Sequence, residues 1–316
     1  MNINDISNKL NLIKCKLINK KVIIFGCGSV GEMTLSVLES LQLEVAYFVD
    51  NNPPNWSTNL NSFPIKNPEV LLLENKSEFF LLVASSFYAD IKDQLHGYGL
   101  QEELNFEPVI EIVEDNKIVF TNIYKRNDWQ DEESVSGTGS NRVQTSKLVE
   151  DLPGVFQKFN IHTIVDAPCG DFNWFQHINY PFKNYFGCDI VEELIEGNKK
   201  NYSNNNRKFL CLDITKNIVP KVDLIFSRDC LVHLPNQDIF KVLDLFKKSN
   251  SRYLLTTTFP SVTKNRNIMV GEWRPINLEL EPFNLPSPIL LINEGCTEDN
   301  GRFADKSLGL WKLEEI

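Results

Sequence analysis

The regular alternation of short apolar segments with helical sequence in the second half of the chain constrains the fold most strongly. Five apolar segments follow one another, at residues 163–167, 184–188, 208–212, 223–227 and 252–257. Strands that alternate with helices are typical of doubly wound α/β folds with a parallel sheet. Two further strands, 288–293 and 308–313, are separated only by polar, glycine-containing sequence, which predicts a closing antiparallel hairpin.

The first half of the chain repeats the pattern around a glycine-rich turn. Its predicted elements are a buried strand at 21–25, the turn at 26–31, a helix at 32–41, strands at 44–49 and 79–85, and a helix at 88–98. The sequence therefore predicts an α/β protein with two doubly wound Rossmann-like domains. Because residues 114–141 are polar, we place the boundary there, with domains at 1–115 and 142–316 and a linker or lid at 116–141. The second domain opens with a helix at 144–159 that Pro153 is expected to interrupt.

Composition and charge exclude several classes of protein. The 316 residues carry 32 Lys and Arg against 42 Asp and Glu, and this net charge of −10 disfavours nucleic-acid partners. No apolar run approaches the roughly 20 residues of a membrane-spanning helix, so we expect a cytoplasmic protein without a membrane span. The seven cysteines include no C-x-x-C pair, which favours reduced thiols over disulfides or a metal site. The sequence does not indicate an oligomeric state.

Acidic residues end three of the strands predicted for the second domain: Asp166 before Pro168-Cys169-Gly170, Asp189 before Ile190, and Asp213 before Ile214. Gly170 allows bare backbone to approach a ligand. Asp189 lies 19 residues past Gly170, where a carboxylate can accept hydrogen bonds from both hydroxyls of a ribose. At Asp213 a carboxylate and the next backbone N–H can meet the edge of an adenine.

On these residues the second domain resembles the class I S-adenosylmethionine-dependent methyltransferases. The resemblance implies that 166–170 is the first cofactor motif, that Asp189 is the ribose acid and that Asp213 lies on the adenine side. It implies S-adenosylmethionine as the cofactor and a seven-stranded sheet that ends in the hairpin. More narrowly, several segments look like a bacterial subgroup associated with surface-glycan biosynthesis: Trp129, 136–140, 144–145, 166–174, 228–234 and 273–278. This narrower resemblance adds Thr145 and Arg228 as cofactor-binding positions.

A hydroxyl acceptor would need a base that removes its proton. His233 and Asp229 lie four residues apart after the fourth strand and would share a face if this stretch is helical. We expect His233 as the first candidate base and Asp229 as the second. In the alternative interpretation, His233 packs the short helix and Asp229 pairs with Arg228. Methylation of an adenine amino group is disfavoured, because residues 227–230 lack the Asn/Asp-Pro-Pro-aromatic motif of such enzymes.

Trp273, Arg274 and Asn277 follow the fifth strand. A Trp/Arg pair can stack on and charge-pair with an anionic, ring-bearing acceptor, whereas the alternative is that these residues pack the loop. The Trp/Arg pair thus favours a small anionic acceptor. Together with it, the resemblance to the surface-glycan subgroup implies O-methyl transfer in surface-polysaccharide biosynthesis, to a sugar hydroxyl, a nucleotide-linked sugar or a phosphoramidate-type group. Residues 136–140 form either a lid over the donor or a simple linker.

In the first domain, Gly26, Gly28 and Gly31 complete a G-x-G-x-x-G pattern, and Asp50 follows 19 residues after Gly31. These residues alone predict NAD. The domain also resembles a Rossmann-like module at the front of bacterial polysaccharide-biosynthesis proteins, and it is shorter than a complete dinucleotide domain with a catalytic half. A nucleotide, a nucleotide sugar or no ligand fits equally well. The alternatives to methyl transfer are an NAD-dependent nucleotide-sugar oxidoreductase or epimerase, and a binding protein without turnover.

Overall fold

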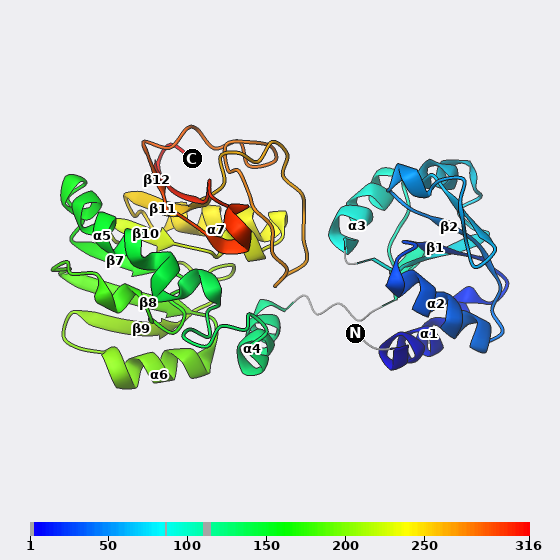
Figure 1. Cartoon of the computed structure of the whole chain (residues 1–316), viewed down its shortest axis with the longest axis horizontal. Helices are drawn as coiled ribbons and strands as arrows, with labels where there is room; N and C mark the ends of the chain where they lie inside the picture. The colour runs from blue at the N-terminus through cyan, green and yellow to red at the C-terminus, as the bar shows by residue number, and fades with distance from the viewer. Residues whose placement is uncertain (1–2, 86, 110–114) are drawn as a thin grey trace. The chain divides into compact units, whose positions relative to one another are not determined.

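The computed structural model describes residues 3–85, 87–109 and 115–316. The chain divides into two compact units, Met1–Ile112 and Val113–Ile316, each with its own sheet, helices and core (Figure 1). The predicted end of the first domain, residue 115, directly follows residues 110–114, which lie outside the described residues. Within the described ranges, no helix combines the length and the apolar content needed to cross a membrane.

The first unit contains a six-stranded sheet in the order β3-β4-β2-β1-β5-β6. β3 is antiparallel to β4, and the other neighbours are parallel. Helix α1 buries Ile6, Leu10, Ile13 and Leu17, whose spacing of three to four residues forms one apolar face against α2 and the sheet. The elements are α1 (Ile3–Leu17), β1 (Lys21–Phe25), α2 (Ser29–Ser40), β2 (Val45–Val49), η1 (Pro53–Asn55), β3 (Asn59–Leu60), β4 (Phe63–Lys66), η2 (Pro68–Leu73), β5 (Phe79–Val83), α3 (Tyr88–Gly97) and β6 (Phe106–Pro108).

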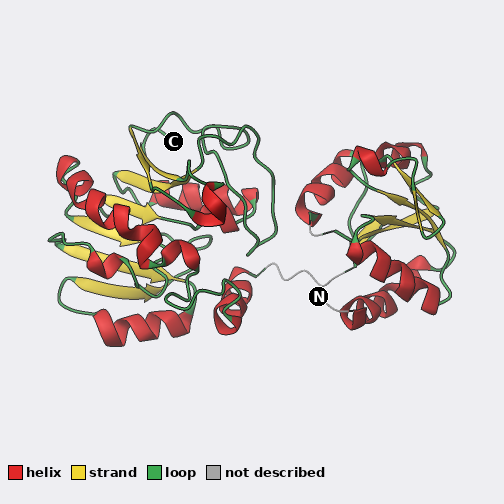
Figure 2. Ribbon diagram, viewed as in Figure 1, coloured by secondary structure: helices red, strands yellow, loops and turns green. Residues whose placement is uncertain are grey.

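The second unit contains a seven-stranded sheet with helices on both faces (Figure 2). Its elements are α4 (Asn116–Arg126), η3 (Thr138–Ser140), α5 (Arg142–Lys158), β7 (Thr163–Asp166), η4 (Phe175–His177), β8 (Asn184–Asp189), α6 (Glu192–Tyr202), β9 (Arg207–Cys211), β10 (Leu224–Ser227), η5 (Leu231–His233), α7 (Asn236–Lys248), β11 (Tyr253–Thr258), β12 (Leu290–Asn293), α8 (Glu298–Gly301) and β13 (Ser307–Lys312).

The strand order of this sheet is β12-β13-β11-β10-β7-β8-β9. β7 to β11 are parallel, and β13 runs antiparallel to both β11 and β12, which confirms the predicted α/β sheet with its closing hairpin. From β7 the chain winds outward through β8 and β9, whereas from β10 it winds outward through β11. In open α/β sheets, ligands bind at the carboxyl ends of the strands where the winding reverses, here between β7 and β10.

Two segments differ from the sequence-based expectation. Residues 116–141, predicted as a linker or lid, contain α4 and η3, and both lie in the second unit. The prediction missed α4 because its apolar residues Val119, Phe120 and Ile123 lie within a polar segment and are only half-buried. Pro153 does not interrupt α5. The helix continues through it because Leu148, Leu152 and Phe156 are buried in the core on both sides of the proline.

Candidate active site

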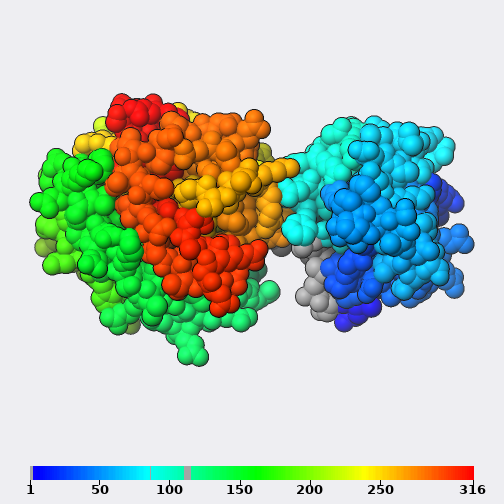
Figure 3. Space-filling view, turned by 45° about the horizontal axis from the view of Figure 1, so that its top comes forward, coloured from blue at the N-terminus to red at the C-terminus, as the bar shows by residue number. Residues whose placement is uncertain are grey.

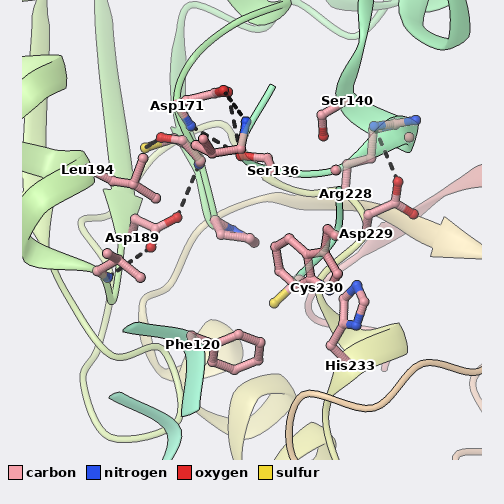
Figure 4. Close-up of a pocket in the computed structure, with 18 of the residues that line it drawn as sticks. Phe120, Ser136, Ser140, Asp171, Asp189, Leu194, Arg228, Asp229, Cys230 and His233 are labelled. Atoms are coloured by element: carbon pink, nitrogen blue, oxygen red, sulfur yellow. Dashed lines mark hydrogen bonds and ion pairs between the residues drawn. The ribbon is translucent and has the colours of Figure 1, made fainter. Parts of the chain in front are cut away.

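A cavity of about 720 Å³ opens at the carboxyl ends of β7, β8, β9 and β10. This volume lies within the range of small-molecule sites. In Figure 4, Asp189 lies on one side of the pocket, and Arg228, Asp229 and His233 lie on the other. The predicted site residues that line it are Asp166, Pro168, Cys169, Gly170, Asp189, Ile190, Asp213, Ile214, Arg228, Asp229, His233 and Trp273.

Asp189 is held at the end of β8 by backbone donors. The Gly170 N–H donates to its Oδ2 at 3.1 Å, and the Val191 N–H donates to its Oδ1 at 2.9 Å. Gly170 has a φ of +53°, which brings the turn after β7 against this carboxylate. Burial raises the pKa of Asp189 to about 6, so the carboxylate predominates at neutral pH. Each oxygen can still accept a hydrogen bond, which suits the hydroxyl pair of a ribose.

Asp166 lies deeper, at the end of β7. The Tyr185 hydroxyl donates to its Oδ2 at 2.5 Å, and burial raises the pKa of the Asp166 carboxyl to about 8. At the end of β9, Asp213 accepts from the backbone N–H and the hydroxyl of Thr215, at 2.9 and 2.6 Å. Lys216 Nζ lies 3.1 Å from the second oxygen of Asp213. The acids predicted at three strand ends therefore line one wall of the cavity.

His233 ends η5 on the opposite side of the pocket. Its Nδ1 lies 3.0 Å from the backbone carbonyl of Glu272, which can only accept, so Nδ1 carries the proton and Nε2 carries a lone pair. The ring packs against Trp129, with 5.0 Å between ring centroids. Burial lowers the pKa of His233 to about 4, so the imidazole is neutral at physiological pH. Its Nε2 is the atom that can accept a proton.

Asp229 does not share a helix face with His233 as expected, because it has a φ of +50° and η5 starts only at Leu231. Lys306 Nζ lies 2.6 Å from its Oδ2, and Arg228 lies 3.3 Å away. Burial would raise the pKa of Asp229, but the two cations outweigh it and lower the pKa to about 2. A carboxylate held in these ion pairs accepts a proton poorly. Of the two candidate bases, His233 has the better geometry.

The cations that line the pocket are already paired. Arg228 directs Nε and Nη2 to Glu294 Oε2 at 3.0 and 2.7 Å, and both side chains are buried. Lys306 pairs with Asp229 and lies 3.6 Å from Glu298. Among the described residues, the lining contains no other lysine or arginine. Both cations are therefore engaged by carboxylates of the protein, and neither is left to pair with an anionic acceptor.

Three of the site residues predicted in the second domain lie outside the lining. Arg274 is fully buried and donates to the backbone carbonyls of η5 and of residue 266, so it anchors the loop before it instead of facing a substrate. The Asn277 amide donates to the carbonyls of Pro260 and Val262. Thr145 is fully buried and donates to the carbonyl of Asn141 inside the first turn of α5. Trp273 does line the pocket, edge-on to Phe303 with ring centroids 4.7 Å apart.

Residues 134–141 lie over the glycine turn. Ser134 Oγ and the Val135 N–H donate to Asp171, at 2.9 and 3.1 Å. At the other end, the Thr138 hydroxyl donates to Glu298 at 2.6 Å. The Gln144 side-chain amide donates to Thr297 Oγ1 at 2.8 Å and accepts from the Thr297 backbone N–H at 3.1 Å. These bonds join the segment around residues 138–144 to residues 297–298. In the space-filling view of the second unit, its orange-red C-terminal segments lie directly against its green segments (Figure 3).

In the first unit, the acid of the predicted dinucleotide fingerprint is hydrogen-bonded by the protein itself. Gly26 has a φ of +103°, and a Cβ on Gly31 would lie 2.2 Å from the Gly26 carbonyl, so both glycines serve the turn between β1 and α2. Gly28 has open space where a Cβ would point. The Asp50 carboxylate, however, accepts from the backbone N–H groups of Cys27 and Asn52 and from the side chains of Cys27 and Asn55. These four donors use the positions at which a ribose would bind.

Several pocket residues were not predicted. Lys306, Glu298 and Phe303 lie in the long connection between β12 and β13, and Asn116 opens α4. The residues that these side chains contact are far away in sequence; Lys306, for example, pairs with Asp229, 77 positions earlier. No local sequence pattern therefore indicates these pocket residues. Within the described residues, no group of three His, Cys, Asp or Glu side chains has an arrangement that could hold a metal ion.

Comparison of the sequence with known proteins gives one partial match. Residues 18–104, within the first unit, match the family described as C2185-like, N-terminal. No curated protein sequence matches the chain.

Solved methyltransferase structures resemble the chain at low identity. The Synechocystis magnesium protoporphyrin IX methyltransferase with bound S-adenosylhomocysteine is 13% identical, covers 63% of this chain and 99% of its own, and has a TM-score of 0.44. Human N-acetylserotonin methyltransferase in complex with S-adenosylmethionine is 14% identical, covers 72% and 66%, and has a TM-score of 0.45. An S-adenosylmethionine-dependent methyltransferase from Clostridium acetobutylicum is 15% identical, covers 54% and 92%, and has a TM-score of 0.41.

Proposed function

We propose that this chain transfers a methyl group from S-adenosylmethionine to a hydroxyl group of a small, ring-bearing acceptor. The observation that carries the proposal is that one cavity joins Asp189, on its glycine turn at Gly170, to the neutral imidazole of His233. The acid suits the ribose of a nucleoside donor, and the imidazole suits the proton of a hydroxyl acceptor. The resemblance of residues 166–170, Asp189 and Asp213 to the cofactor motifs of class I methyltransferases supports the same donor.

The residues at the ends of β7, β8 and β9 would hold the donor. Asp189 would accept from the ribose hydroxyls, the backbone at Gly170 would lie against the donor, and Asp213 would lie on the adenine side. When bound, S-adenosylmethionine supplies a sulfonium methyl group that a nucleophile can displace. Residues 134–141, tied to Asp171 and to Glu298, would exclude water from this part of the pocket.

His233 would take the acceptor proton at Nε2. The bond from Nδ1 to the Glu272 carbonyl orients the ring, and the low pKa keeps the imidazole neutral. A base whose conjugate acid has a pKa of about 4 takes a proton only from an acidic group. The hydroxyl becomes acidic as its oxygen bonds to the methyl group, so we infer that the proton moves late in the transfer.

The acceptor end of the pocket is aromatic and lacks an unpaired cation among the described residues. Trp129, Trp273, Phe259 and Phe303 offer flat apolar surfaces, against which the ring of a sugar can pack. We therefore propose a neutral sugar hydroxyl in place of the anionic acceptor expected from the sequence. The resemblance to the surface-glycan subgroup supports a glycan precursor as its source.

Calorimetric titration tests the donor part of the proposal. S-adenosylhomocysteine should bind at one site per chain, whereas NAD⁺ should give no heat, and Asp50→Ala should leave the affinity for S-adenosylhomocysteine unchanged. Binding of NAD⁺ alone, lost in Asp50→Ala, would overturn the proposal in favour of a nucleotide-sugar oxidoreductase.

Transfer of labelled methyl groups tests the acceptor part. Neutral sugars and their phosphorylated counterparts are offered in parallel with the same labelled donor. Label should enter the neutral sugars, and transfer only to the phosphorylated ones would refute the inference from the paired cations.

A further inference from the structure

Trp129 lies in the connection between α4 and η3, and its side chain lines the pocket. Its ring packs against the imidazole of His233, with 5.0 Å between ring centroids and 33° between ring planes. At this distance the two rings are in van der Waals contact. Trp129 therefore touches the proposed base from a different segment of the chain.

The hydrogen bond at Nδ1 fixes the His233 ring only in part. This bond, to the Glu272 carbonyl at 3.0 Å, holds one corner of the imidazole. A hydrogen bond tolerates a deviation of about 30° from linearity. A tilt of that size about Nδ1 moves Nε2, on the far side of the ring, by about 1 Å, and such a misplacement can lower a rate by about 10²-fold. A second contact is needed to direct Nε2, and the indole of Trp129 supplies it.

Trp129 is in turn held by the segment 134–141. Gly137 in this segment has a φ of +89°, and a Cβ added to it would lie 3.1 Å from Trp129 Cβ. The glycine thus lets the backbone pack closely on the tryptophan side chain. Two donors of the same segment bind Asp171, directly after the glycine turn. The indole is therefore backed by a segment that is itself tied to the donor end of the pocket.

The ring contact also adds to the burial of His233. Burial is the largest cause of the low pKa of this imidazole, so removal of the indole would let water reach the ring and raise the pKa. The charged and polar groups that act on the imidazole belong to other segments: Asp229 and the Glu272 carbonyl, which raise its pKa, and Lys306 and Arg274, which lower it. These groups remain when Trp129 is replaced, so a change in the pKa reports on the lost ring.

We propose that Trp129 is a positioning residue that holds the His233 imidazole with Nε2 directed at the acceptor hydroxyl. This inference rests on the proposed function, since it assumes that His233 is the base. It goes beyond the role of the indole as an apolar surface for the acceptor, because Trp129 acts on the reaction through the histidine.

The kinetic test compares Trp129→Ala and Trp129→Phe with wild type in the full chain. Single-turnover methyl transfer to a neutral sugar that wild type methylates is measured with donor and acceptor saturating, at about pH 8, where the imidazole is neutral in every variant. The rate should fall roughly 10- to 100-fold in Trp129→Ala, and the affinity for S-adenosylhomocysteine should not change. Trp129→Phe keeps an aromatic ring and should recover most of the rate.

Titration by NMR measures the effect on His233 without turnover. The chain has four histidines, and the signals of His233 are identified by their loss in His233→Gln. The pKa of His233, about 4 in wild type, should rise towards its ordinary value of 6.5 in Trp129→Ala. This rise alone would make the imidazole a stronger base, so a fall in rate would come from lost orientation.

Phe303→Ala is the matched control for the titration. It removes another aromatic ring of the pocket lining, whose ring contacts are with Phe259 and Trp273. The pKa of His233 should stay near its wild-type value in this variant. An equal rise in Phe303→Ala and Trp129→Ala would show that the pKa reports on a widened pocket, and would overturn the assignment of Trp129.

The remaining outcomes separate the two proposals. If wild type methylates no neutral sugar, the proposed function fails. If wild type is active and Trp129→Ala keeps the saturating rate, needing only more acceptor, or keeps a His233 pKa of about 4, the assignment of Trp129 is overturned while the proposed function stands. Trp129→Leu provides the same comparison if the alanine variant does not fold. In wild type, a nuclear Overhauser effect should connect the indole and imidazole protons, and its absence overturns the assignment without any variant.

Discussion

Replacing Asp189 by alanine tests the donor site most directly. The substitution removes the carboxylate at the end of β8 that the Gly170 and Val191 N–H groups hold in place. Hydrogen bonds to a charged group contribute about 1.5–3 kcal/mol, which corresponds to a loss of affinity for S-adenosylhomocysteine of roughly 10- to 150-fold. Calorimetric titration measures the dissociation constant. If Asp189→Ala binds as tightly as wild type, the assignment of the ribose acid is refuted.

Asp223→Ala separates lost affinity from lost stability. Asp223 also accepts hydrogen bonds from two backbone N–H groups, those of His162 and Thr163 at 2.9 Å, but it lies directly before β10, next to the start of β7, and does not line the pocket. Both alanine variants lose comparable backbone hydrogen bonds and should unfold at lower urea concentrations than wild type. Only Asp189→Ala should lose affinity. Equal losses in both variants would show that the effect passes through general destabilisation.

The pH dependence of binding provides a second test of Asp189. Burial raises its pKa to about 6, and the carboxylate form accepts the ribose hydroxyls best. The affinity of wild type for S-adenosylhomocysteine should fall as the pH drops through about 6. The contribution of this group to folding has the opposite sign, because its raised pKa favours the protonated form in the folded state. That stabilisation is lost as the pH rises through about 6. A binding curve with the same pH dependence in Asp189→Ala would contradict the assignment.

Three further predictions concern the base, a buried ion pair and the glycine turn. His233→Gln should lower single-turnover methyl transfer by roughly 10²–10⁴-fold and leave the affinity for S-adenosylhomocysteine unchanged; a parallel loss of affinity would point to a structural role. Glu294→Ala should cost about 3 kcal/mol in urea unfolding, because it removes the bidentate partner of the buried Arg228 guanidinium and leaves only Asp229, at 3.3 Å. An unchanged midpoint would show that the pair with Glu294 adds no net stability. Gly170→Ala should weaken donor binding, because its Cβ would lie 2.2 Å from Ser136 Oγ. Adding Ser136→Gly should restore only part of that affinity, because an alanine at position 170 remains strained at a φ of +53°. If titration gives the double variant the same affinity as Gly170→Ala alone, the steric explanation is contradicted.

The alternation of strands and helices, the closing hairpin and the acids at three strand ends could be predicted from the sequence. These features follow from local chemistry, since the carboxyl ends of parallel strands meet at one edge of the sheet wherever the strands form. The same reasoning located Gly170 and Asp189, which the structure brings within hydrogen-bond distance. It did not predict α4, because the apolar residues of this helix, Val119, Phe120 and Ile123, lie within a polar segment and are only half-buried.

Only the tertiary structure decided which polar groups remain available to a ligand. Asp50 ends a complete glycine fingerprint, yet donors from the turn and from residues 52 and 55 occupy its carboxylate. Arg274 is a residue type that commonly binds anionic substrates, but here its guanidinium donates to backbone carbonyls. Asp229 is paired with Lys306, 77 positions away in sequence. Strand periodicity is a local property that a sequence displays directly, whereas the satisfaction of a hydrogen-bonding group depends on partners that only long-range packing brings together.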